Sequence, residues 1–171
     1  MKHLEKERLF VGLFEENKTR VLRLCYGYLN SEQEAEDLFQ EIMTNVWNSL
    51  DGFRREAKIT TWLYRIAVNT ALIYRRKLRR GQALVSGGAA PDTAAAPAPA
   101  QDDEERLRAL RASIAALPSQ DGLIVTLLLE GLSYKEIADV TGITINYVGF
   151  KISRIKEALE KLMKGVSHGT A

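Results

Sequence analysis

Residues 52–80 read GFRREAKITTWLYRIAVNTALIYRRKLRR, and the rest of the chain is interpreted outward from this segment. Its first five residues are a charged, glycine-led stretch without an apolar period. From Ile59 onward, apolar residues recur every three or four positions, which predicts a helix with one buried stripe. Thr60 or Thr61 is a candidate cap for its start. We expect the buried stripe to contain Ile59, Trp62, Leu63, Ile66, Thr70 and Ile73, and the opposite face to carry Tyr64, Arg65, Asn69, Arg76 and Arg79.

The segment is strongly basic between two acidic neighbours. It holds nine Lys and Arg residues against one acid, a net charge of +8, whereas residues 1–51 and 81–104 each carry −4. The helix dipole favours one or two cations at a helix C-terminus. Five cations within residues 75–80 repel one another, so they indicate a polyanionic partner.

Aromatic residues lie among these cations: Phe53, Trp62, Tyr64 and Tyr74. Rings that stack on bases, together with cations along the backbone, are typical of proteins that hold single-stranded nucleic acid. The alternative interpretation is that Trp62 belongs to the core and that the basic run is only a solvated face. We predict nucleic-acid contact.

Composition excludes several classes of site. Cys25 is the only cysteine, so there is no internal disulfide and no thiolate zinc site. His3 and His168 lie near opposite ends of the chain, and no glycine-rich phosphate-binding motif is present. We therefore expect no metal, no cofactor and no catalytic residue, in a protein that is not an enzyme.

No segment has the length and apolarity of a membrane span. The longest apolar stretch, residues 122–132, is interrupted by Thr126 and Glu130 and is far shorter than the roughly 20 residues that a bilayer requires. The first ten residues lack the apolar core of a signal peptide. We expect a cytoplasmic protein without stable membrane insertion.

Two helices are predicted before the basic segment, at residues 4–29 and 32–50. Gly12 and Asn17 are a candidate break in the first, and Ser31 begins a capping-box sequence for the second. One side of the second helix carries the polar residues Glu34, Asp37, Gln40 and Glu41. This side is either an ordinary solvated face or a surface that docks a protein partner.

The composition changes abruptly after Arg80. Residues 81–100 contain eight alanines, three glycines and three prolines, with no aromatic residue. Such a segment cannot build a core, so we predict a disordered tether over residues 81–102 and a domain boundary there. Helices are expected again at residues 103–116 and 119–130.

A helix-turn-helix is predicted after Gly131. Ser133 and Glu136 form a capping box, and residues 141–143 are a short turn around Gly142. The buried stripe of the second helix is expected at Val148, Ile152, Ile155, Leu159 and Leu162, and its outward, DNA-facing side at Tyr147, Phe150, Lys151 and Arg154. The alternative is a helical hairpin whose basic residues only keep it soluble.

Both halves together resemble the extracytoplasmic-function sigma factors of bacterial RNA polymerase. EAEDLFQEIMTNVWNSL and FRREAKITTWLYRIAVN are similar to the polymerase-docking and promoter-melting segments of region 2 in that family. LPSQDGLIVTLLLEGLSYKEIADVTGITINYVGFKISRIKEAL is similar to region 4. The resemblance covers most of the chain apart from the tether and the termini.

The resemblance implies roles for particular residues. The helix that binds core RNA polymerase would carry Asp37, Gln40, Glu41 and Trp47. The loop of residues 53–59 would capture a flipped base of the minus-ten element, and region 4 would read the minus-thirty-five element. The implied promoter-DNA contacts are Phe53, Arg54, Arg55, Lys58, Trp62, Arg65, Asn69, Arg76, Arg79 and Arg80 in the first half, and Tyr147, Phe150, Lys151 and Arg154 in the second.

The chain departs from the family pattern at four positions. Lys58 stands where the family usually has a small or polar residue, and Tyr147, Gly149 and Phe150 stand where Thr, Lys and Ser are more common. Gly149 costs about 1 kcal/mol of helix propensity. The promoter sequence therefore cannot be transferred from better-known members.

These observations predict an all-α protein with two small helical domains, residues 1–80 and 103–166, joined by the tether. The predicted function is a sigma factor that binds core RNA polymerase, recognises promoter DNA and promotes strand opening, with an anti-sigma factor as a further candidate partner. The alternatives are a stand-alone helix-turn-helix regulator and an all-α adaptor that binds only protein.

Overall fold

The computed structural model describes residues 3–29, 31–85 and 103–167, and within these ranges every regular element is a helix. The predicted all-α class is thereby confirmed. No helix in the described ranges is long and apolar enough to cross a membrane. The elements are α1 (His3–Tyr28), α2 (Glu32–Ser49), the 3-10 turn η1 (Leu50–Gly52), α3 (Ile59–Val85), α4 (Asp103–Ala115), α5 (Ser119–Leu129), α6 (Tyr134–Thr141) and α7 (Ile145–Ser167).

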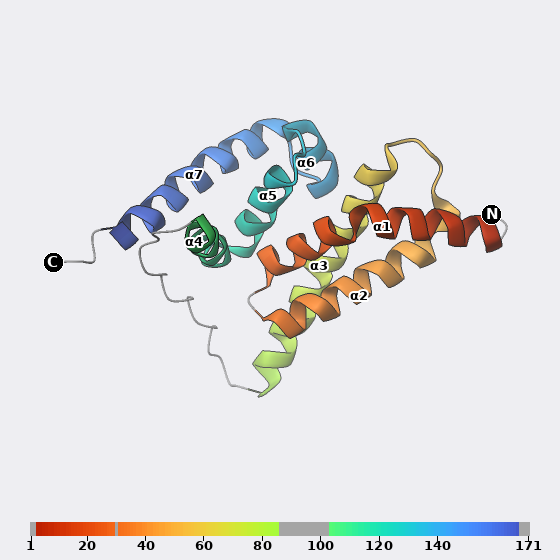
Figure 1. Ribbon diagram of the computed structural model, residues 1–171, viewed down its shortest axis with the longest axis horizontal. Coiled ribbons are helices and arrows are strands. Elements are labelled where there is room, and N and C mark those ends of the chain that lie inside the picture. Colours follow the sequence, from red (N-terminus) through yellow and green to blue (C-terminus); the bar gives the residue numbers. More distant parts are fainter. Residues whose placement is uncertain (1–2, 30, 86–102, 168–171) are drawn as a thin grey trace.

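The first half of the chain packs α1, α2 and α3 side by side (Figure 1). Its core includes Leu24, Leu38 and Leu63, one from each helix, all of them fully buried. The predicted break in α1 does not occur. Asn17 is buried and donates its side-chain amide to the Leu13 carbonyl at 3.0 Å, so the polar group is satisfied within a continuous helix.

The start of α3 differs from the prediction. The helix begins at Ile59, and the Trp62 amide donates to the Lys58 carbonyl at 3.0 Å. Thr60 and Thr61 therefore lie inside the first turn rather than at a cap. The helix also continues to Val85, five residues into the predicted tether, of which residues 86–102 lie outside the described part.

The buried face of α3 is also rotated from the predicted one. Tyr64 is 2% exposed, although we expected it outside, and Ile73 is 47% exposed, although we expected it inside. The reason is that α3 packs on three other helices, α1, α2 and α6, rather than on one surface. Burial raises the pKa of Tyr64 to about 12. The residues of α3 that are buried are Thr61, Leu63, Tyr64, Ala67, Val68, Thr70 and Ala71.

The second half forms the predicted helix-turn-helix. The Ser133 hydroxyl accepts from the Glu136 amide at 3.2 Å, and the Glu136 carboxylate accepts from the Ser133 amide at 2.9 Å, which completes the capping box of α6. Gly142 ends α6 with φ 77°, a left-handed conformation that glycine adopts without steric cost. Val148, Ile152 and Ile155 bury one stripe of α7.

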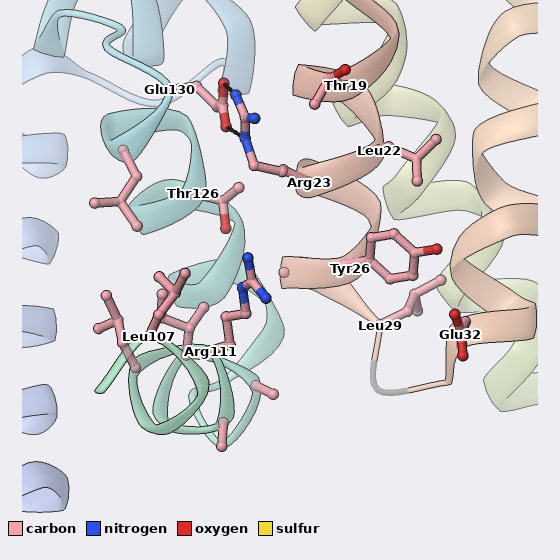
Figure 2. A pocket seen from close by; sticks show the side chains of 16 residues that line it. Thr19, Leu22, Arg23, Tyr26, Leu29, Glu32, Leu107, Arg111, Thr126 and Glu130 are labelled. Atoms are coloured by element: carbon pink, nitrogen blue, oxygen red, sulfur yellow. Dashed lines mark hydrogen bonds and ion pairs between the residues drawn. The ribbon is translucent and has the colours of Figure 1, made fainter. Parts of the chain in front are cut away.

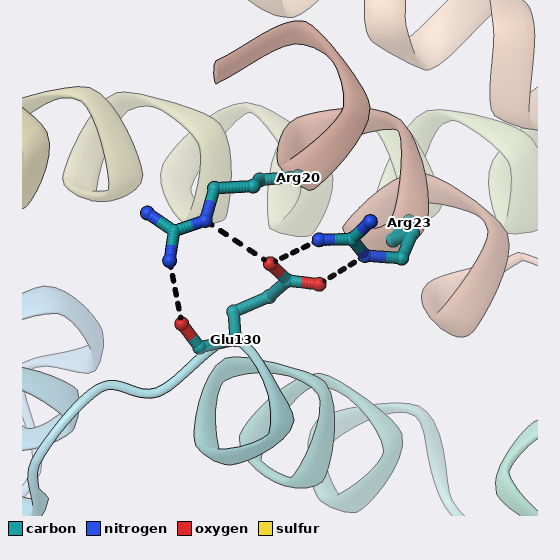
Figure 3. Close-up of polar contacts among 3 residues, drawn as sticks. All are labelled: Arg20, Arg23 and Glu130. Carbon is teal, nitrogen blue, oxygen red and sulfur yellow. Dashed lines mark hydrogen bonds and ion pairs between the residues drawn. The ribbon is translucent and has the colours of Figure 1, made fainter. Parts of the chain in front are cut away.

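The two halves pack against each other, which the sequence did not predict. Helix α1 lies against α5, and α3 lies against α6. Glu130, at the end of α5, is only 8% exposed. Its carboxylate forms a bidentate pair with the Arg23 guanidinium, with Nη2 2.8 Å from Oε2, and its backbone carbonyl accepts from Arg20 at 3.2 Å (Figure 3).

A glycine permits the closest approach between α1 and α5. A Cβ atom on Gly27 would lie 2.4 Å from the hydroxyl oxygen of Thr126, well inside van der Waals contact. That hydroxyl donates to the Gly122 carbonyl at 2.8 Å, so its position is fixed within α5. The side chain at position 27 therefore sets how closely the halves can pack.

We predict that Gly27→Ala lowers the free energy of unfolding by about 1–2 kcal/mol, because overpacking outweighs the gain in helix propensity. Urea-induced unfolding followed by circular dichroism measures the change. Adding Thr126→Ala should restore most of the loss, because the nearest remaining atom, the Thr126 Cβ, would then lie at an ordinary 3.4 Å.

Gly12→Ala is the matched control, since it lies in the same helix and a Cβ there would meet nothing within 4 Å. It should stabilise the protein by up to about 1 kcal/mol. Equal stability of Gly27→Ala and Gly12→Ala would show that the close approach of α1 and α5 is not present in solution.

Candidate functional site

The polar face of α2 is open at its centre. Asp37 and Gln40 are exposed, and the Asp37 carboxylate accepts from Gln33 at 3.3 Å. Glu41 is half-buried and pairs with Lys77 of α3 at 3.0 Å. The exposed acid that remains for a partner is therefore Asp37, with Gln40 one turn further along the helix.

Trp47 lies apart from this polar face and packs against α1. Its ring is 5.3 Å from the Phe10 ring in an edge-on arrangement, and the Lys6 ammonium stands 4.7 Å from its centroid. The indole is half-buried by these contacts. Through these contacts the indole helps to hold the C-terminal end of α2 against α1.

The loop before α3 joins an aromatic pair to exposed cations. The rings of Phe53 and Trp62 are 5.1 Å apart at 50°, and both are half-buried. Arg54, Arg55 and Lys58 are exposed beside them. Arg55 has φ 59°, a left-handed conformation that costs a non-glycine residue roughly 1–2 kcal/mol. The loop is thus held in a specific, strained shape next to a partly accessible tryptophan.

The exposed face of α3 continues this basic surface. Arg65, Asn69, Arg76, Arg79 and Arg80 are all exposed. Arg75 differs from its neighbours, because it donates to the Tyr28 carbonyl at 2.9 Å and burial lowers its pKa. The basic run at residues 75–80 therefore contains one structural arginine, while Arg76, Arg79 and Arg80 stay available to an anion.

Helix α6 covers the beginning of this basic surface. Glu136 lies 3.6 Å from the Lys58 ammonium, and the Asp139 carbonyl accepts from Arg65 at 3.2 Å. A polar groove of about 500 Å³ runs between the loop and α6, lined by Glu56, Ala57, Lys58, Thr61, Ser133, Lys135, Glu136 and Asp139. The Glu136 carboxylate and the Asp139 carbonyl of the second half thus contact Lys58 and Arg65 of the first half.

A second groove, of about 970 Å³, is lined mainly by residues of α1, α4 and α5 (Figure 2). Its walls are mainly apolar, with Leu22 and Tyr26 on one side and Leu107 and Leu110 on the other. The Glu130–Arg23 pair lies at its edge. The contact between the halves is therefore incompletely filled. Among the described residues no group of His, Cys, Asp or Glu could hold a metal ion.

The outward face of α7 carries the four residues predicted for it. Tyr147 and Phe150 are exposed, and Arg154 is exposed one turn beyond them. Lys151 is only half-exposed, because its ammonium lies 2.8 Å from the Asp121 carboxylate of α5. This hydrogen bond raises the pKa of Lys151. The positive charge of Lys151 is therefore balanced by Asp121 within the protein, whereas Arg154 is exposed to an anion.

Sequence reasoning missed the acids that oppose these cations. The carboxylates of Asp121 and Glu136 contact Lys151 and Lys58, the backbone carbonyl of Asp139 accepts from Arg65, and the carboxylate of Glu130 joins the halves. Only Glu130 had a visible signal, as a single acid within the otherwise apolar residues 122–132. The partners of the other three depend on tertiary packing.

Comparison with known proteins gives consistent matches to both halves. The family model Sigma-70 region 2 matches residues 13–81, and Sigma-70, region 4 matches residues 107–159. The RNA polymerase sigma-H factor of Pseudomonas aeruginosa is 30% identical over 169 residues, covering 92% of this chain and 88% of the relative. The ECF RNA polymerase sigma-E factor of Escherichia coli K12 is 32% identical over 153 residues, covering 82% and 79%.

A solved structure shows the same fold. It is the sigma factor RpoE in complex with the anti-sigma factor NepR from Bartonella quintana. The two folds superpose with a TM-score of 0.70, at 24% identity, over 90% of this chain and 97% of the other. The fold therefore agrees over nearly the whole length of both chains.

Proposed function

The chain belongs to the extracytoplasmic-function sigma factors of the sigma-70 family, and we propose that it binds core RNA polymerase, recognises two promoter elements and helps to open the duplex. The observation that carries this proposal is the presence, in one chain, of a cation–aromatic surface on α3 and a helix-turn-helix with an exposed face on α7. The phosphodiester chemistry belongs to the polymerase, and we assign no catalytic residue to this chain.

For polymerase docking, we propose the exposed face of α2. Asp37 and Gln40 would make the direct contacts, because both are accessible. Glu41 would contribute less, because Lys77 already neutralises it. Trp47 would act indirectly, by holding α2 on α1 through its contact with Phe10.

For the minus-ten element, we propose the loop before α3 and the exposed face that follows it. A flipped base would stack near Trp62 and Phe53, whose paired rings lie at the start of the basic face, and unstacking that base costs a few kcal/mol. Arg54, Arg55 and Lys58 would hold the phosphates beside it. Asn69, Arg76, Arg79 and Arg80 would extend the contact along the strands. Binding of DNA here requires α6 to move away from Lys58 and Arg65.

For the minus-thirty-five element, we propose that α7 enters the major groove. Arg154 would contact DNA directly, while Lys151 would do so only if it exchanged Asp121 for a phosphate. We also propose that residues 1–80 and 103–166 operate as two domains joined by residues 81–102. An anti-sigma factor is a candidate partner, since the RpoE structure with the same fold is bound to one.

Multi-round transcription with purified core polymerase, on DNA fragments from upstream of the chain's own gene, tests the proposed function. A transcript from a defined start site should appear only when the protein is present. A stand-alone regulator would instead shift duplex DNA without polymerase and yield no transcript. An adaptor that binds only protein would show no salt-dependent DNA affinity.

We predict that Asp37→Arg combined with Gln40→Ala weakens binding to core polymerase by at least about tenfold, because truncation of a central interface contact and a reversed charge typically cost more than about 1.4 kcal/mol. Glu41 is left in place so that its pair with Lys77 is kept. The measurement is co-purification of core polymerase with the tagged protein.

Glu16→Arg is the control for this pair of substitutions, since it reverses an exposed acid on α1 and changes the net charge equally. It should bind core polymerase like the unmodified protein, and the helical circular dichroism of both variants should be unchanged. Normal polymerase binding by the Asp37→Arg, Gln40→Ala protein would place the docking surface elsewhere.

We also predict that Asp121→Asn makes DNA binding more dependent on salt. The substitution releases the Lys151 ammonium, which can then neutralise one more phosphate, so the slope of log affinity against log salt should steepen by about 0.9. Glu157→Gln removes the same charge from the exposed surface of α7 without releasing Lys151, and should leave the slope unchanged. Equal slopes for the two variants would mean that Lys151 makes no phosphate contact when freed. Fluorescence anisotropy of labelled duplex across a salt series measures both.

A further inference from the structure

Two aromatic rings lie side by side on the outward face of α7. Tyr147 is 44% exposed and Phe150 is 55% exposed, with ring centroids 6.2 Å apart and planes inclined by 21°. A third exposed ring, Tyr134 of α6, lies next to the backbone of α7, where a Cβ on Gly149 would be 3.7 Å from it. Single exposed apolar residues are ordinary, but a group of rings on one surface marks a binding surface.

The surroundings of the pair favour a polyanion over an apolar protein partner. The Lys151 ammonium stands 5.8 Å from the centroid of the Tyr147 ring, and the Arg154 guanidinium carbon stands 5.7 Å from that of Phe150. Each ring therefore lies beside a cation. Because α7 is the second helix of a helix-turn-helix, the polyanion that fits this face is the major groove of duplex DNA.

The side chains of this face that could contact bases are mainly apolar. Guanine is recognised in the major groove by two-donor contacts from Arg or Lys, whereas thymine presents its C5 methyl group to apolar side chains. The Lys151 ammonium lies 5.8 Å from the centroid of the Tyr147 ring and is already bound to the Asp121 carboxylate, 2.8 Å away. The central positions of the face therefore offer rings, and the cation beside Phe150, Arg154, is exposed.

We propose that Tyr147 and Phe150 recognise thymine methyl groups in the upstream promoter element, so that thymine methyls rather than guanine edges specify the bases opposite these rings. The inference rests on the proposed function, since it supplies the base chemistry for the same helix. Arg154, whose guanidinium carbon lies 5.7 Å from the centroid of the Phe150 ring, would contact the phosphates beside these bases.

A selection experiment with holoenzyme tests the inference. Full-length protein assembled with core polymerase would select duplex DNA in which the upstream region is randomised. The enriched element should carry thymine, on either strand, at two neighbouring positions. That element would then be rebuilt with uracil in place of each thymine, which removes only the methyl group. Each replacement should weaken holoenzyme binding by about three- to fivefold, the effect of exposing one buried methyl group.

Variants of the protein assign the effect to the rings. Phe150→Ala should bind the thymine and uracil forms of the element within about twofold of each other at the position that this ring contacts. Val11→Ala is the matched control, since Val11 is an exposed apolar residue on α1, whereas α7 packs on α4, α5 and α6. It should keep the full difference between thymine and uracil.

Two results would overturn the inference while leaving the proposed function intact. One is an enriched element without thymine at a fixed position. The other is unchanged affinity after uracil replacement, in a promoter from which the same holoenzyme starts transcription. The aromatic pair would then be a surface for a protein. Failure of the chain to bind core polymerase would overturn the proposed function, and this inference with it.

Discussion

The buried carboxylate of Glu130 is the constraint on which the packing of the two halves depends. Its side chain is 5% exposed, and it belongs to a helix that is otherwise apolar on almost every side. Removing a carboxylate from water without a cation costs several kcal/mol. Helix α5 can therefore stay against α1 only while Arg23 and Arg20 remain beside Glu130. The side chains of these arginines are 52% and 45% exposed, so both cations would stay solvated if the halves parted, which makes the contact reversible.

The packing of the two halves leaves one proposed binding surface exposed and covers part of the other. The exposed face of α2 is free of the second half, so a protein could dock there without disturbing the closed arrangement. The beginning of the basic face on α3 is covered by α6, whose Glu136 and Asp139 occupy Lys58 and Arg65. On the proposed function, DNA phosphates and α6 compete for the same cations. Docking through α2 and promoter binding through α3 would then be separable steps, and the second would require the halves to part.

Much of the fold was predictable because it follows from local patterns. The helices, the N-cap at Ser31, the capping box at Ser133 and the left-handed Gly142 depend on residues close in sequence. The buried face of α3 was not predictable, because α3 packs on several helices at once. Tyr64 is therefore buried and Ile73 exposed, the reverse of the prediction. The site residues predicted on outward faces are exposed, except for the half-buried Glu41 and Lys151, whereas Trp62, which we expected in the buried stripe of α3, is only half-buried. The ion pairs of Lys151 and Glu130 join residues 30 and more than 100 positions apart, which no periodicity reveals.

The central claim is that the free protein is closed through Glu130 and that its halves part when promoter DNA binds. The most direct measurement is the distance between spin labels at Glu16→Cys on α1 and Lys156→Cys on α7, by double electron–electron resonance. Cys25 can remain, because it is fully buried and its thiol pKa is raised to about 12. We predict one narrow distance distribution for the free protein and a longer distance in the complex with core polymerase and promoter DNA. An unchanged distance in that complex would contradict the account.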